Sequence, residues 1–327
     1  MSIGGIAVPI ELLRLLVSLV AIIAFALTTA GLILIYVERK VAGFVQRRPG
    51  PYEVGPYGLF QLLADAVKMI GKELHTPIKG DWLLFWAAPV LALAPIPLLF
   101  LPIPFSETLI GYDTELGVIL VLAFTGVNVL SLCLAGYSSY NKWALLGAVR
   151  SVSQAVAYEI PLLVTVLSVV LMSGTLKLSE LAGLQGTWPW QWNWTIQPLG
   201  FFIFFICMLA ETNRAPFDLP EAESELTAGF HTEYSGLGFG LFFVSEYAAM
   251  VAGSAVCATL FLGGWHGPFL WGWVWFLIKI YALLLTMMWV RWTFPRVRFD
   301  QLLNISWRWL IPLSLLNLLF TAFIVKL

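Results

Sequence analysis

Charged residues are scarce in this sequence. Asp, Glu, Lys and Arg together make up 11% of the 327 residues, and the formal net charge is −1, whereas an average soluble domain has about 25% charged residues. So small a charge gives no general attraction to phosphate polymers, which excludes nucleic acid as a partner. Hydrophobic residues make up 60% of the chain, and the mean hydropathy is +0.86. These values exclude an ordinary water-soluble protein and predict a chain embedded in a lipid bilayer.

Cysteine and histidine are also few. The three cysteines, Cys133, Cys207 and Cys257, lie inside apolar runs, and none belongs to a C-x-x-C motif. The three histidines lie in or beside predicted loops, so no two of them are placed to bind a haem between membrane helices. The sequence therefore predicts no disulfide, zinc, iron–sulfur or other metal site. If the chain takes part in redox chemistry, we expect the metal centres in partner subunits.

The chain contains long apolar runs. An α-helix of about 20 apolar residues is long enough to cross a bilayer, so each run is a candidate transmembrane helix. The sequence predicts an all-α protein, a single polytopic membrane domain over residues 1–327 with eight transmembrane helices. Prolines in the second run should bend it, and the fifth and eighth runs need flanking residues to cross. The eight runs are Leu12 to Val37, Leu83 to Leu101, Leu116 to Tyr137, Ala155 to Ser173, Leu199 to Ala210, Phe239 to Leu262, Phe269 to Val290 and Ile311 to Ile324.

The cations are distributed unevenly among the connections. Of the 18 Lys and Arg residues, 14 lie between runs 1 and 2, 3 and 4, 5 and 6, and 7 and 8. By the positive-inside rule these connections face the cytoplasm, and both termini lie on the outer side. The first run lacks a basic leader and is too long for a signal-peptide core, so we expect it to remain as a span. The opposite connection holds Trp188, Trp190, Trp192 and Trp194, a pattern typical of the lipid headgroup zone.

The first predicted cytoplasmic connection contains an amphipathic segment. From Leu59 to Leu74, apolar residues recur at helical spacing and polar residues occupy the opposite face. The pattern predicts a helix along the membrane surface, and an interfacial anchor is its simplest role. The apolar face has Leu59, Leu62, Leu63, Ala66 and Ile70, and the polar face has Gln61, Asp65, Lys68 and Lys72.

Ionisable residues that lie within or at the end of later predicted spans are Glu159, Glu211, Glu246 and Lys279. Such groups are costly in a membrane and usually mark a functional site. A low dielectric disfavours the charged form of a carboxylate, so acids in such places can exchange protons near neutral pH, as a proton relay requires. The structural alternative is that Lys279 pairs with Glu246 or Glu159 to fix the packing of the helices.

The connection after the fifth run is acidic. Residues 211–233 contain six acids and one cation, Arg214. Asp218 and Glu221 match a capping box at the start of a helix, but capping does not account for the other acids. We expect a cluster that handles protons or attracts cations, with a solvated acidic loop as the alternative. The six acids are Glu211, Asp218, Glu221, Glu223, Glu225 and Glu233.

The last predicted cytoplasmic connection is basic, with four arginines around Asp300. We expect this patch to pair with the acidic loop, a docked subunit or anionic lipid. In the connection before the fourth run, Lys142, Arg150 and Gln154 extend the polar rim of the same face. The four arginines of the basic patch are Arg291, Arg296, Arg298 and Arg308.

These motifs, in this order, resemble the quinone-site membrane subunit of respiratory complex I. The resemblance extends through every predicted cytoplasmic connection, and the stretch from Ala210 to Phe230 is its most specific part. The motifs are Glu38-Arg39-Lys40 and Gly55-Pro56-Tyr57-Gly58-Leu59, then Leu145-Leu146-Gly147-Ala148 and Tyr158-Glu159, then Ala210 to Phe230 with Glu233-Tyr234 and Glu246-Tyr247, and finally Pro295-Arg296 with Arg298 and Asp300-Gln301.

The resemblance implies that quinone enters sideways from the bilayer between the first span and the amphipathic helix. It then moves along a chamber toward an iron–sulfur cluster in the docked peripheral arm, and this chain supplies the floor and entrance of the chamber. Residues implied to line or shape the chamber are Arg39, Arg48, Asp65, Lys68, Phe230 and Arg298. Residues implied to form an acidic path from quinone reduction to proton movement are Glu159, Glu211, Glu221, Glu223, Glu225 and Glu246.

The resemblance also implies partners and a location. The chain is expected to be a subunit of NADH:quinone oxidoreductase, a translocase, with no redox centre of its own. Its substrate is ubiquinone or menaquinone, and FMN and iron–sulfur clusters belong to the other membrane and peripheral-arm subunits. Membrane lipid surrounds it in the bacterial inner membrane.

Two other functions fit parts of the pattern. Charges within spans and broken helices also occur in self-contained ion transporters. A membrane anchor of a related hydrogenase, which uses no quinone, is the second alternative. The long charged connections favour docking to partner subunits over a transporter.

Overall fold

The computed structural model of the chain describes residues 2–3, 6–7, 18, 20–25, 28–220 and 227–326. Most of these residues are helical, which confirms the all-α class; the strands within these ranges are two antiparallel pairs of residues. In chain order the elements are β1 (Ser2–Ile3), β2 (Ile6–Ala7), the π-helix η1 (Thr29–Leu34), α2 (Ile35–Val45), η2 (Pro56–Gly58), α3 (Gln61–Gly71), α4 (Trp82–Leu93), α5 (Pro95–Phe100), α6 (Gly117–Ser138), α7 (Lys142–Ser173), α8 (Leu178–Gly183), η3 (Pro189–Gln191), α9 (Asn193–Ile196), α10 (Pro198–Glu211), η4 (Gly229–His231), α12 (Gly236–Phe261), α13 (Gly272–Thr293), α14 (Phe299–Ile305), η5 (Ser306–Leu310) and α15 (Ile311–Lys326).

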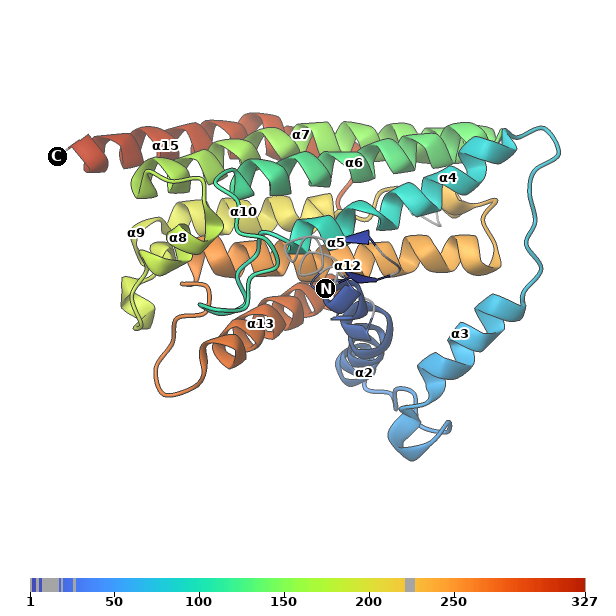
Figure 1. The fold of residues 1–327 in the computed structure, drawn as a ribbon. Coiled ribbons are helices and arrows are strands. Elements are labelled where there is room, and N and C mark those ends of the chain that lie inside the picture. The colour runs from blue at the N-terminus through green and yellow to red at the C-terminus, as the bar shows by residue number, and fades with distance from the viewer. Residues whose placement is uncertain are drawn as a thin grey trace.

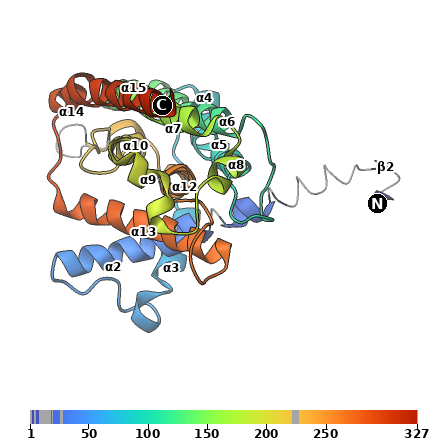
Figure 2. The same cartoon turned by 90° about the vertical axis from the view of Figure 1, so that its left-hand side faces the viewer.

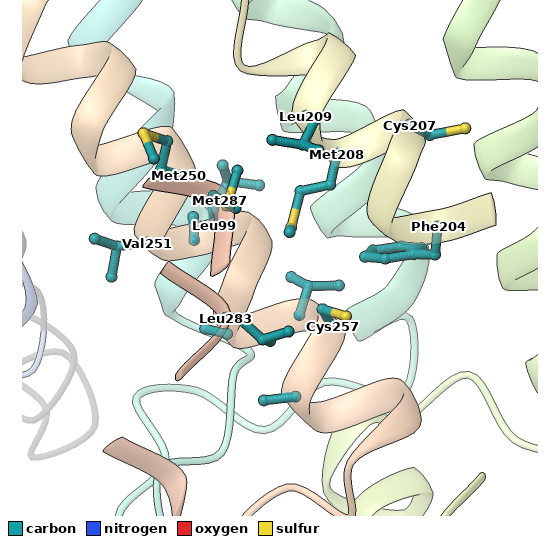
Figure 3. Close-up of a cluster of buried hydrophobic side chains, with 14 of the residues drawn as sticks. Leu99, Phe204, Cys207, Met208, Leu209, Met250, Val251, Cys257, Leu283 and Met287 are labelled. Carbon is teal, nitrogen blue, oxygen red and sulfur yellow. The ribbon is translucent and has the colours of Figure 1, made fainter. Parts of the chain in front are cut away.

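The long helix α12 lies within the bundle and packs against α4, α10, α13 and η1 (Figure 1). Small residues on α12 allow this close approach, as is usual between membrane helices. A Cβ atom on Gly253, for example, would lie 2.9 Å from Cγ of Met208 in α10. Buried side chains of α10, α12 and α13 form the main core, among them Met208, Cys257 and Met287 (Figure 3).

Helices α2 and α3 lie along one side of the bundle (Figures 1 and 2). The turn η2 joins them, and Gly55 and Gly58 in this turn have positive φ values of 75° and 79°. A Cβ atom on Gly58 would lie 2.4 Å from the carbonyl oxygen of Pro51, so the turn requires glycine there. The turn therefore sets the position of α3 against α2.

Six helices in the described part of the chain are long and apolar enough to cross a membrane, so the predicted count of eight is not confirmed. The first predicted run, Leu12 to Val37, lies partly outside the described residues. The fifth run is present as α10, whose 14 residues span only about 21 Å at 1.5 Å per residue. The six helices are Trp82–Phe100, Gly117–Ser138, Lys142–Ser173, Gly236–Phe261, Gly272–Thr293 and Phe299–Lys326.

Helix α7 begins earlier than predicted, at Lys142 instead of Ala155. Asn141 is extended, with φ −121° and ψ 129°, and its side chain accepts a hydrogen bond from the backbone N–H of Trp143 at 3.0 Å. This is the usual geometry of a helix N-cap. Lys142, Arg150 and Gln154 therefore belong to the first turns of α7 and not to a loop before it.

The predicted amphipathic helix is present as α3, although it is shorter than Leu59 to Leu74. Leu62 is buried against the bundle, whereas Leu63 and Ile70 are 51% and 65% exposed. Apolar side chains left uncovered on such a helix suit the boundary between lipid headgroups and acyl chains. Of the four alternating tryptophans, Trp188, Trp190 and Trp194 are exposed as expected for a headgroup belt, but Trp192 is buried.

Candidate functional site

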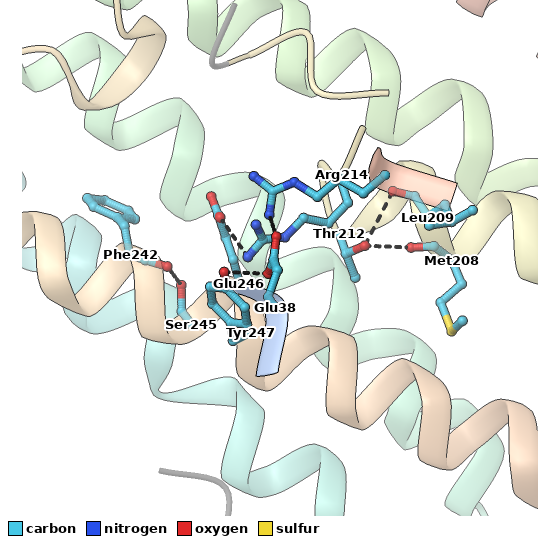
Figure 4. Close-up of polar contacts among 10 residues, drawn as sticks. Glu38, Met208, Leu209, Thr212, Arg214, Phe242, Ser245, Glu246 and Tyr247 are labelled. Carbon is cyan, nitrogen blue, oxygen red and sulfur yellow. Dashed lines mark hydrogen bonds and ion pairs between the residues drawn. The ribbon is translucent and has the colours of Figure 1, made fainter. Parts of the chain in front are cut away.

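A group of charged side chains is buried where α2, α12 and α13 meet (Figure 4). Glu38 of α2 is 4% exposed. Its Oε2 atom accepts a hydrogen bond of 2.6 Å from the hydroxyl of Tyr247 in α12. Its Oε1 atom is paired with Nη1 of Arg291 in α13. One carboxylate thus joins three helices.

Arg214, in the loop after α10, extends this group toward Glu246 of α12. Its guanidinium carbon lies 4.1 Å from the centre of the Tyr247 ring, and Nη2 is 3.6 Å from Oε2 of Glu246. Arg214 is 3% exposed. We call Glu38, Arg214, Glu246, Tyr247 and Arg291 the Glu38 network. Its two carboxylates balance its two guanidinium groups, which is how proteins usually keep charges in a low-dielectric interior.

Lys279 is not part of the Glu38 network. Its Nζ atom donates hydrogen bonds to the backbone carbonyl oxygens of Gly264 at 2.9 Å and His266 at 2.6 Å. The alternative in which Lys279 pairs with Glu246 or Glu159 is therefore wrong. Glu246 pairs with Arg214 instead.

The start of the acidic loop is held against α7 by Gln154, which is fully buried. Its Nε2 atom donates to the carbonyl oxygens of Ala210 at 2.7 Å and Phe217 at 2.9 Å. Asn213 between them has a positive φ of 50°, so the chain turns sharply as α10 ends. These contacts place the side chain of Arg214 in the interior.

The basic patch contacts the acidic loop, which is one of the three partners predicted for this patch. Nη2 of Arg296 lies 3.0 Å from Oδ2 of Asp218. The backbone N–H of Val297 donates to the carbonyl oxygen of Pro216 at 3.0 Å. The segment after α13 therefore fixes the loop that carries Arg214 from its other side.

A cavity of about 60 Å³ lies between α5, α6, α10 and α12. Its walls include Glu211 together with Thr125 and Asn128 of α6. Glu211 interacts with Thr125 and electrostatically with Glu159 of α7. Glu159 reaches the same region, because its Oε1 atom is 3.8 Å from the position of a Cβ atom on Gly126. Most of the cavity wall is apolar, and the structure brings two of the predicted acids, Glu211 and Glu159, together beside it.

A second cluster of predicted residues lies where α2 faces α3. Nη1 of Arg39 is 2.6 Å from Oδ2 of Asp65, and Gln61 donates to the other oxygen at 3.1 Å. Burial raises the pKa of Asp65, but the hydrogen bonds from Arg39 and Gln61 and the charges of Arg39 and Lys68 outweigh it. The pKa of Asp65 is therefore lowered from its usual value.

The other three residues predicted for a chamber lie apart from this cluster. Arg48 is exposed and donates to Oε1 of Gln46 at 2.7 Å. Arg298 is exposed just before α14. Phe230 is fully buried, with its ring 5.4 Å from that of Phe242. Described contacts join none of these three to the Arg39–Asp65 pair.

The acids Glu221, Glu223 and Glu225 lie outside the described residues. Four members of the Glu38 network were not predicted as site residues: Glu38, Arg214, Tyr247 and Arg291. One signal was present in the sequence, because Glu38 directly follows the first apolar run, where an acid is costly.

The fold and the Glu38 network define a multi-pass membrane protein with charged side chains buried in its interior. The chain belongs to the NADH dehydrogenase family, which its sequence matches over residues 17–322. It is 49% identical to the H subunit of the NADH-quinone oxidoreductase of Desulfotalea psychrophila, over 97% of this chain and 98% of that protein. Identity to the corresponding H subunits of Dehalococcoides mccartyi strain CBDB1 and Carboxydothermus hydrogenoformans is 47% and 45%, over 95% and 96% of this chain and 87% and 89% of those proteins. The predicted resemblance is confirmed.

Proposed function

We propose that this chain is the membrane subunit of an NADH:quinone oxidoreductase that forms the quinone entrance and links quinone reduction to proton translocation. The shared name of its relatives supports this function over a self-contained transporter or a hydrogenase anchor. The observation that carries the proposal concerns two consecutive residues of α2. Arg39 pairs with Asp65 at the protein surface, while Glu38 is buried in the Glu38 network.

The face between α2 and α3 suits a ligand with a polar head and an apolar tail. Arg39, Asp65 and Lys68 supply charge there, and α3 leaves apolar side chains such as Val67 exposed. Ligand sites usually combine an apolar lining with a few polar groups in this way. In this proposal quinone, either ubiquinone or menaquinone, enters between the first span and α3. Partner subunits complete the chamber, which Arg48, Phe230 and Arg298 help to shape.

Reduction of a quinone places negative charge on its oxygens and creates a demand for two protons. Arg39 and Glu38 are consecutive residues of α2. In this proposal, a change of charge or position at Arg39 alters the electrostatic environment of the Glu38 carboxylate. Tyr247 and Arg214 connect Glu38 to Glu246. Coupled groups of this kind shift protonation together.

The acidic path continues, in this proposal, through Glu211 and Glu159 at the cavity, and Glu221, Glu223 and Glu225 extend it. Electrons arrive from FMN and iron–sulfur clusters of the partner subunits. The proposed location is the bacterial inner membrane, with the α3 end of the bundle in the cytoplasm and both termini on the outer side.

The test uses Glu211→Gln and Glu159→Gln in the assembled complex. The number of protons moved per electron is measured in vesicles, and we expect it to fall in both variants while NADH oxidation by a soluble acceptor persists. Glu180→Gln is the control, because Glu180 is an exposed acid in α8 that does not line the cavity. An unchanged ratio in both acid variants would exclude the acidic path.

A further inference from the structure

An open hollow of about 600 Å³ lies at the end of the bundle where α4 and α7 begin and α6 ends (Figure 1). Three separate segments form its walls: the connection after α3, with Ile78 and Lys79, the turn from α6 into α7, with Asn141 and Lys142, and Glu233 after η4. None of these residues belongs to the Glu38 network or lines the cavity beside Glu211. The hollow is therefore separate from the sites described above.

Two close contacts hold the walls of this hollow in place. A Cβ atom on Gly80 would lie 2.5 Å from the carbonyl oxygen of Ser138 at the end of α6. This close approach requires glycine, and it fixes the backbone beside Lys79 against α6. On the other wall, Nδ2 of Asn141 donates to Oε1 of Glu233 at 2.7 Å. The shape of the hollow is therefore set by the packing of the bundle.

Charges of both signs line the hollow without pairing. Lys79 and Lys142 supply ammonium groups and Glu233 a carboxylate, yet none of the three forms an ion pair within the described residues. Lys142 is also the first residue of α7, where the helix dipole disfavours a cation, and the first turn of α7 holds no acid. Glu73 and Asp81 are near in sequence but do not line the hollow. Two cations and one anion therefore face the same open space.

The hollow lies at the depth of lipid head groups. The 32 residues of α7 extend about 48 Å, and a bilayer with its head groups is about 40 to 45 Å thick. Lys142, in the first turn, is therefore placed at the level of the head groups. Aromatic side chains gather at this level in membrane proteins, and those exposed at this end of the bundle are Trp82, Tyr137, Tyr140 and Trp143.

An apolar side chain accompanies the charges. Ile78 lines the hollow directly before Lys79 and is 98% exposed. Nζ of Lys142 lies 5.0 Å from the centre of the Trp143 ring, so an aromatic face adjoins the other ammonium group. A site with charged groups beside exposed apolar ones suits a ligand that has a charged head and an apolar tail.

We infer that this hollow binds the head group of phosphatidylethanolamine, with its phosphate at Lys79 and Lys142 and its ammonium group at the Glu233 carboxylate. Basic pockets between transmembrane helices bind phospholipid head groups by such contacts. A purely anionic head group would be repelled by Glu233, and a choline head group has no N–H to donate to it. The inference needs neither quinone nor proton translocation, so it can fail independently of the proposed function.

Crosslinking in the assembled complex tests the site. The photoreactive residue p-benzoylphenylalanine replaces Ile78, and the complex is placed in nanodiscs of equimolar phosphatidylethanolamine, phosphatidylglycerol and phosphatidylcholine. After illumination, mass spectrometry identifies the lipid joined to the peptide that contains residue 78. We expect phosphatidylethanolamine adducts to exceed each of the others by about fivefold. The same photoreactive residue at Leu130 is the control, because Leu130 is exposed in α6 but does not line the hollow. Adducts there should follow the lipid composition.

Charge variants, each carrying the photoreactive residue at position 78, assign the contacts. Lys79→Gln together with Lys142→Gln should lower the phosphatidylethanolamine adduct by about fivefold or more. Glu233→Gln should keep an adduct but abolish the preference over phosphatidylglycerol, because only the ammonium contact is lost. Lys72→Gln is the matched control, since Lys72 is an exposed cation outside the hollow, and we expect it to change neither the yield nor the preference.

Several results would overturn the inference. One is an adduct at residue 78 that follows the lipid composition or favours phosphatidylglycerol. A crosslink to another subunit in place of lipid is a second, because the hollow would then be a protein contact. An unchanged adduct in the double lysine variant, or an unchanged preference in Glu233→Gln, would show that these charges do not bind the head group.

Discussion

The hydroxyl of Tyr247 donates a hydrogen bond to Oε2 of Glu38 at 2.6 Å, joining α12 to α2 inside the bundle (Figure 4). The ring of the same tyrosine lies beneath Arg214. Tyr247 therefore contacts both Glu38, through its hydroxyl, and Arg214, through its ring.

We expect Tyr247→Phe to remove the hydrogen bond to Glu38 while keeping the aromatic ring beside Arg214. Loss of a hydrogen bond to a buried charged group costs about 1.5 to 3 kcal/mol, so the assembled complex should unfold at a lower temperature and move fewer protons per electron. Tyr281→Phe is the control, because Tyr281 in α13 makes no hydrogen bond within the described structure. Equal losses in both variants would show that the Tyr247 hydroxyl has no special role.

The pair Glu38–Arg291 should behave as a buried ion pair. Arg291→Met leaves the Glu38 carboxylate without its cation, and removal of one partner from such a pair costs about 3 to 5 kcal/mol. The double variant Glu38→Gln with Arg291→Met should regain part of this loss, because neither charge remains unpaired. A double-mutant cycle on the thermal stability of the complex measures the coupling. Additive effects would contradict the pairing.

The Arg39–Asp65 pair makes a prediction about pH. Because the pKa of Asp65 is lowered in the folded protein, the contribution of the pair is present above the ordinary carboxyl pKa and is lost only as pH falls through the lowered value. We expect Asp65→Asn to raise the KM for quinone by the same factor at every pH from about 5 to 8. The exposed acid Glu53 provides the control, Glu53→Gln. If the increase in KM caused by Asp65→Asn disappears above pH 5, the Asp65 carboxylate does not contribute through its pair with Arg39.

Gln154 should be essential for the position of the acidic loop. Gln154→Leu removes two buried hydrogen bonds, to the carbonyl oxygens of Ala210 and Phe217. Each carbonyl keeps a backbone donor, from Asn213 and Leu219 respectively, so each lost bond should cost about 0.5 to 1.5 kcal/mol. We expect a clear loss of thermal stability and fewer protons per electron. Ser153→Ala is a matched change on the same helix, since the Ser153 hydroxyl bonds only to the carbonyl of Val149. If Ser153→Ala has the same effect, the loop is not held by Gln154.

Local patterns in the sequence predicted the elements that depend on local chemistry. The apolar spacing of α3 predicted an amphipathic helix, and the runs around α6, α12 and α13 predicted long apolar helices. The positions of Glu159, Glu211 and Glu246 within apolar runs predict a functional role, because ionisable groups are costly in a membrane. Hydropathy alone misplaced the start of α7, because its first turns carry polar residues and its N-cap is a single asparagine.

The sequence could not predict contacts between distant segments. Glu38 and Arg291 are separated by 253 positions, and Gln154 bonds to carbonyl groups in another helix and its loop. No periodicity encodes such pairs, since the packing of the bundle creates them. The same holds for Lys279: the sequence suggests a carboxylate partner, whereas the structure supplies backbone carbonyls and an indole ring.

The length of α7 has a consequence for assembly. Its 32 residues extend about 48 Å, whereas the hydrocarbon layer is about 30 Å thick. Unless it is strongly tilted, several of its turns must project past the acyl chains, and Gly147 in this part presses against the backbone of Phe230. This projecting part of α7 is therefore held against η4 by backbone packing, so its position is fixed within the chain itself.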